Sequence, residues 1–116
     1  MKKILFTILL FAFFLTTGQA AVDECSCVFY VRKMAIPQPP KVEWAYQLQV
    51  NQTYPVPDSW VVFKNEGIYK GGGHASWVVA VATSTFLVFD WNYLGKCQFS
   101  KRIIRFDDFL IKGYYW

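Results

Sequence analysis

The stretch HASWVVAVATSTFLVFDWNY, residues 74–93, decides the fold. Its two halves, 74–83 and 85–93, are rich in β-branched and aromatic residues, which is typical of β-strands. The small polar residues Thr83 and Ser84 lie at the junction of these halves. We therefore expect an antiparallel hairpin that turns near residue 83.

This hairpin would bring the only histidine of the chain close to two polar side chains. Asp90 and Asn92 alternate with apolar residues, so they share one face of the second strand. With a turn centred on residue 83, His74 lies directly opposite Asn92 and diagonally from Asp90, within side-chain reach. A carboxylate or an amide would then orient the imidazole. The alternative is a solvated loop histidine that follows three glycines.

Further strands are expected on both sides of the hairpin, over residues 59–64 and 97–105. A helix is expected over residues 26–35, because its apolar residues recur with helical spacing. Asp23 or Ser26 can cap its start, and Pro37 ends it. The apolar face of this helix is expected to hold Cys27, Tyr30, Val31 and Met34.

Residues 42–50 are expected to form a second short helix. Helices followed by a meander of strands predict an α+β domain, in which N-terminal helices pack on an antiparallel β-sheet.

Residues 1–20 are expected to be a cleaved signal peptide and residues 21–116 a single domain. Lys2 and Lys3 precede an apolar run that is short for a membrane span. The predicted product is therefore secreted or held in the periplasm or cell wall, without stable membrane insertion. Of the twelve basic residues, ten remain without Lys2 and Lys3, against eight acidic residues. This net positive charge is too small to predict nucleic-acid binding.

The three cysteines, Cys25, Cys27 and Cys97, leave at least one thiol unpaired. Cys27 lies in the first turn of the expected helix, whose positive end stabilises a thiolate, and a base such as His74 would make it a nucleophile. Two other interpretations stay open. One is a structural disulfide from Cys25 or Cys27 to Cys97; the other is a metal site, which the C-x-C spacing disfavours.

Several segments, taken together and in order, resemble the CHAP amidohydrolase/peptidase domain of the NlpC-type papain-like superfamily. They are CVFYVRK from residue 27, WVVFKN from residue 60, GGGHASWVVAV from residue 71, VFDWNY from residue 88 and SKRIIRFDD from residue 100. The resemblance implies a papain-like fold with Cys27 as nucleophile and His74 as general base. Asp90, where the family usually has glutamate, or Asn92 would orient the histidine.

The resemblance further implies a secreted amidase or endopeptidase that hydrolyses an amide bond in peptidoglycan. It would act as a monomer, with no metal or cofactor, and the Cys27 N–H would hold the oxyanion. The alternative is a catalytically inactive domain with a binding or structural role. Where the family often has Gly-Asp, this chain has Asp58-Ser59-Trp60, which affects one wall of the substrate groove.

If Cys27 is the nucleophile, Cys25 and Cys97 remain for a disulfide that would tie the helix start to the strand after Asn92. The alternative is that both are free thiols. Arg102 and Arg105 are expected on a solvated strand face.

Overall fold

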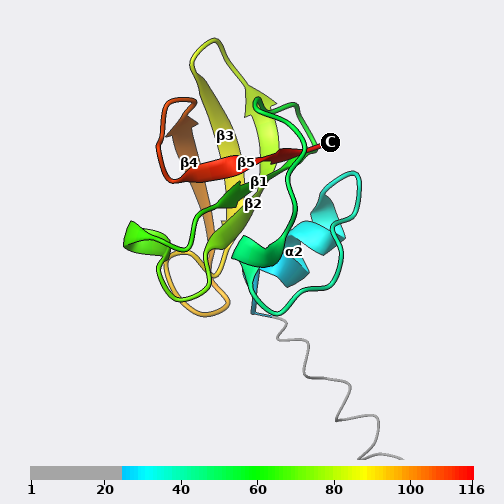
Figure 1. The fold of residues 1–116 in the computed structure, drawn as a ribbon, viewed down its shortest axis with the longest axis vertical. Helices are drawn as coiled ribbons and strands as arrows, with labels where there is room; N and C mark the ends of the chain where they lie inside the picture. Colours follow the sequence, from blue (N-terminus) through cyan, green and yellow to red (C-terminus); the bar gives the residue numbers. More distant parts are fainter. Residues whose placement is uncertain (1–24) are drawn as a thin grey trace, which may run out of the picture.

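The computed structural model describes residues 25–116, and the predicted signal peptide and Asp23 lie outside the described residues. This part of the chain combines one α-helix with a five-stranded antiparallel sheet, a mixed α+β arrangement (Figure 1). No helix within it is long and apolar enough to cross a membrane. The elements are α2 (Cys27–Met34), β1 (Trp60–Phe63), β2 (His74–Val81), β3 (Thr85–Trp91), β4 (Phe99–Arg105) and β5 (Ile111–Tyr115).

Helix α2 begins close to where the sequence predicts, with Ser26 as its N-cap. The Ser26 Oγ accepts the Phe29 N–H at 3.1 Å and so satisfies one amide of the first turn. Val28 and Val31 are the buried residues of the helix. Val31 belongs to the predicted apolar face but Val28 does not, and Cys27 is only partly buried against the core that contains the helix.

The expectation of a second helix over residues 42–50 is wrong, since only a 3₁₀ turn forms there, at Ala45–Gln47. Other segments take the backbone groups that a helix would use. The Tyr46 N–H donates to the Gly72 carbonyl at 3.0 Å, and the Lys112 Nζ donates to the Tyr46 carbonyl at 2.9 Å. Tertiary partners thus override the local helical preference of this segment.

The predicted meander is present as β1 to β4, each strand pairing antiparallel with the next. A fifth strand, β5, is additional to that prediction and pairs with β1, so the order is β4-β3-β2-β1-β5. In Figure 1, β5 (red) runs at a steep angle to β3 and β4, which shows the strong twist of the sheet.

Both faces of β1 are buried, because the sheet separates two hydrophobic cores. Trp60 and Val62 lie in the core that contains helix α2. Val61 and Phe63 lie in the second core, with Phe86 and other residues of β3 to β5. The alternation of a single strand therefore supplies both cores.

The register between β2 and β3 decides which residues meet beside the cores. Trp77 pairs with Phe89, the register expected for a turn centred on residue 83. Nearer the turn the pairing differs by one residue, and the shift occurs between Val78 and Ala80. A bulge within β2 therefore restores the expected register at the end of the hairpin where His74 lies.

Candidate active site

His74 is the first residue of β2, and only 5% of its surface is exposed. Its Nε2 lies 2.8 Å from the Oδ1 of Asp90 on β3. Asp90 is fully buried, as are Phe86 and Val88 on the same face of the strand, which matches the predicted alternation. A buried carboxylate that bonds one ring nitrogen fixes the orientation of the imidazole.

Cys27 is the first residue of α2, is partly buried and carries a free thiol. The thiol lies close enough to the His74 imidazole to help raise the pKa of His74 by hydrogen bonding and charge. Because Asp90 occupies Nε2 of the ring, Nδ1 is the nitrogen left to meet the thiol. The structure therefore brings Cys27, His74 and Asp90 together, from one helix and two adjacent strands.

Asn92 lies close to the histidine but does not hold it. It follows β3 in the left-handed conformation, with φ of 69°, and its N–H donates to the Gln98 carbonyl at 2.9 Å. Its exposed side chain lines a pocket of about 120 Å³ together with His74. Of the two residues expected to orient the imidazole, Asp90 makes the contact.

The expectation that Arg102 lies on a solvated face is wrong, since its side chain is only 15% exposed. Arg102 Nε donates to Asp90 Oδ2 at 2.7 Å, and its Nη2 donates to Asp90 Oδ1 at 3.0 Å. Alternation on β4 places Arg102 on the same face as the buried Ile104, where a charge needs a partner. Arg105 is exposed, as expected.

Aromatic rings cover this cluster of charges. The Tyr69 ring stacks on the imidazole of His74 with centroids 5.6 Å apart and planes 4° apart, and its hydroxyl accepts Arg102 Nη1 at 2.8 Å. The Phe63 and Tyr93 ring centroids lie 5.9 Å and 5.5 Å from the imidazole. Arg102 Cζ lies 3.5 Å from the Tyr93 centroid, a cation–π contact. These rings keep water from the ion pair and so strengthen it.

The protonation states of Asp90 and His74 follow from these contacts. Burial by itself would raise the pKa of Asp90, but hydrogen bonds and charges from His74 and Arg102 outweigh it and lower the pKa to about 2. Burial also disfavours the charged form of His74, but hydrogen bonds and charges from Asp90 and Cys27 raise its pKa above 6.5. Asp90 is therefore ionised at neutral pH and favours a protonated His74.

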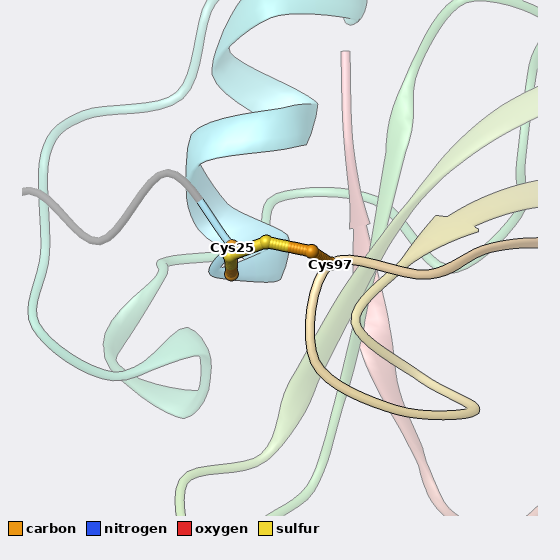
Figure 2. The surroundings of a disulfide bond; sticks show 2 residues. All are labelled: Cys25 and Cys97. Carbon is orange, nitrogen blue, oxygen red and sulfur yellow. A yellow bond between two sulfur atoms is a disulfide. The ribbon is translucent and has the colours of Figure 1, made fainter.

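A disulfide joins Cys25 to Cys97, with Cα atoms 4.5 Å apart (Figure 2). It ties the residue two places before the helix start to the loop between β3 and β4. This confirms the predicted pairing, which leaves Cys27 free. The two alternatives, a disulfide through Cys27 and three free thiols, are wrong. Within residues 25–116, no group of three or more histidine, cysteine or acidic side chains is placed to hold a metal ion.

The sequence indicated Cys27, His74 and Asp90 but not the residues that support them. Ser76 donates its Oγ hydrogen to Asp90 Oδ1, and Arg102 holds both carboxylate oxygens. A signal was available for Ser76, since it lies two residues after His74 and so on the same face of the strand.

Comparisons of the chain with protein-family models, with curated proteins and with solved structures give no match.

Proposed function

We propose that the protein is an exported cysteine hydrolase that cleaves an amide bond in peptidoglycan, of the CHAP type and with a papain-like fold. One observation carries the proposal: a free thiol lies within reach of an imidazole whose other nitrogen bonds a buried, ionised carboxylate. This arrangement activates a thiol for attack on a carbonyl. A helix that begins at the thiol and packs on an antiparallel sheet that supplies the histidine is also in keeping with that fold.

In the proposed reaction, the Cys27 thiol first gives its proton to the neutral imidazole of His74 at Nδ1, which forms a thiolate–imidazolium pair. The Cys27 thiolate then attacks the carbonyl carbon of the amide. The backbone N–H of Cys27, at the helix start, stabilises the oxyanion. His74 then gives the proton to the leaving amine as the C–N bond breaks, which leaves a thioester on Cys27. Water attacks the thioester, with His74 as base, and releases the carboxylic acid and the thiol. Asp90 orients the imidazole and stabilises its cation throughout.

The substrate class comes from the resemblance of the motifs and from the expected export. The Cys25–Cys97 disulfide is compatible with an oxidising compartment outside the cytoplasm, where the bacterial wall lies. The bond would be the muramoyl–alanine amide or an amide of the stem or cross-bridge peptide.

A second candidate is a domain that keeps this fold and binds a wall fragment without cleaving it. The pocket beside His74 favours the absence of cleavage, because its volume of about 120 Å³, below the roughly 300–1,000 Å³ of most small-molecule sites, leaves little room for a substrate at the histidine. The rate at which iodoacetamide alkylates Cys27 near neutral pH separates the two. An activated thiol reacts faster than an ordinary cysteine thiol, and an inactive relative shows no such excess.

The hydrolase is tested by digesting purified peptidoglycan and identifying the products by mass. The wild type should release fragments with new amino and carboxyl ends, and Cys27→Ser should lose nearly all of this activity. Asp90→Asn should lose about 100-fold or more, because the imidazole loses its orienting carboxylate. Asn92→Ala is the matched control and should lose much less, since its side chain does not hold the ring. Undiminished cleavage by Cys27→Ser rejects the mechanism.

A further inference from the structure

We propose that Arg102 is a positioning residue, which acts through Asp90 to set the proton equilibrium of the Cys27–His74 pair. The inference rests on the proposed cysteine–histidine chemistry but not on the identity of the substrate. Arg102 lies on β4, one strand beyond the strand that supplies Asp90. It therefore adds a fourth group to the site, in the order thiol, imidazole, carboxylate and guanidinium.

The first support is the geometry at the carboxylate. Arg102 binds both oxygens of Asp90, through Nε at 2.7 Å and Nη2 at 3.0 Å. A planar guanidinium that makes two such bonds fixes the plane of the carboxylate. Because His74 Nε2 meets the Oδ1 of that carboxylate at 2.8 Å, the arginine also fixes the direction from which the histidine is held.

The second support is that the guanidinium is itself held in place. Its Nη1 donates to the Tyr69 hydroxyl at 2.8 Å, and its Cζ lies 3.5 Å from the Tyr93 ring centroid. The Tyr69 ring also stacks on His74, so one tyrosine contacts both the arginine and the histidine. The positive charge of Arg102 therefore stays at a fixed place beside the pair.

The third support is the charge balance around His74. The groups that face it come from every neighbouring element and are Cys27, Tyr69, Lys70, Asp90, Tyr93 and, behind Asp90, Arg102. Lys70 is exposed at the pocket rim, so Arg102 is the partly desolvated cation of this set. It offsets the negative charge of Asp90 and thereby limits how strongly that charge holds protons on the Cys27–His74 pair.

The test is the pH dependence of Cys27 alkylation by iodoacetamide, measured between about pH 5 and about pH 9 with the Cys25–Cys97 disulfide intact. Arg102→Gln removes the charge and leaves Asp90 uncompensated, so the midpoint of the alkylation rate should move to higher pH by about one unit. Arg102→Lys keeps the charge without the two-pronged contact and should return most of that shift. Arg105→Gln, an exposed arginine on the same strand, is the matched control and should leave the midpoint unchanged.

A folded Arg102→Gln variant with the wild-type midpoint overturns the proposal, and so does an equal shift in Arg105→Gln. If circular dichroism shows that Arg102→Gln does not fold, Tyr69→Phe decides. That change removes only the hydroxyl that binds Nη1, so a smaller shift in the same direction supports the proposal and no shift overturns it. A wild type whose Cys27 reacts no faster than an ordinary thiol rejects the proposed hydrolase itself, which is a separate outcome.

Discussion

The Asp90 carboxylate makes the stability of the protein depend on pH at the acid end. Its pKa is about 2 in the folded chain, against 3.8 for the ordinary side chain. Its contribution is therefore complete above pH 3.8 and is lost as the pH falls through about 2. We expect the free energy of unfolding in urea to fall by about 2 kcal/mol over this range. Asp90→Asn should lack that fall, whereas Asp107→Asn, in an exposed ion pair, should largely keep it.

His74 acts with the opposite sign, because its pKa is raised in the folded chain. Its contribution is complete below pH 6.5 and fades as the pH rises through the folded-state value. The same urea series should therefore show maximal stability in the mildly acidic range, between the two transitions. A stability that keeps rising from there into the alkaline range would contradict the assignment of charges at the site.

The residues of the proposed reaction were predictable from local patterns and one turn. Alternation places Asp90 on one face of its strand, a turn near residue 83 brings that face to His74, and helical spacing puts Cys27 on the apolar face of the helix. Arg102 was not predictable in this way. Its partner, Asp90, lies on another strand. Only the register between β3 and β4, in which Arg102 is opposite Val88, shows that Arg102 and Asp90 lie within reach of each other.

At the scale of elements, the glycine-rich segment before β2 positions His74. Gly73 has a φ of 73°, and a Cβ there would lie 2.9 Å from the Phe63 carbonyl oxygen. We expect Gly73→Ala to lower the free energy of unfolding by about 2 kcal/mol or more, because it combines backbone strain with a clash against a neighbouring strand. It should also slow the alkylation of Cys27, since His74 is the next residue.

Gly71→Ala is the control for that prediction. Gly71 also has a positive φ, of 107°, but a Cβ at this position has no atom within 4 Å. It should cost stability through backbone strain alone and leave the reactivity of Cys27 near the wild-type rate. Equal reactivity in the two variants would mean that the packing of Gly73 does not position the histidine.

The element boundaries were predictable where a segment is rich in β-branched and aromatic residues or repeats its apolar residues at helical spacing. Helix α2 and strands β1 to β4 lie within the predicted ranges for this reason. Residues 42–50 were mispredicted because their backbone bonds to distant segments, which no local pattern reveals. Strand β5 was missed because Gly113 interrupts a short apolar run, and its pairing partners, β1 and Gln52, lie far away in the sequence.

For the whole molecule, the Cys25–Cys97 disulfide closes a loop over a sequence separation of 72 residues. In the chain-entropy model such a closure stabilises by about 4 kcal/mol. We expect the Cys25→Ser/Cys97→Ser double variant to lose that amount of unfolding free energy, measured by denaturation in urea. Reduced wild type should match it, since both lack the same bond. A double variant as stable as the oxidised wild type would show that the bond adds nothing to the fold.

The pairing was only one of several possibilities in the sequence, because spacing does not place Cys97 near Cys25. The pairing requires that the loop between β3 and β4 lies beside the start of α2. This placement depends on the strand order of the sheet and on how α2 packs against the sheet. The disulfide pairing therefore follows from the tertiary structure and not from a local sequence pattern.

The free thiol between two bonded cysteines also has a consequence for maturation. In the newly made chain, Cys97 lies almost equally far along the sequence from Cys25 and from Cys27, so loop-closure entropy does not favour the native pair over a Cys27–Cys97 pair. An oxidant that acts before folding would thus also bond Cys27 to Cys97 and remove the thiol of the proposed nucleophile. The native pairing requires that the sheet assembles first and that oxidation follows. The proposed activity would then be acquired last. The fraction of molecules with a free Cys27 thiol would measure how often folding had preceded oxidation in the cell.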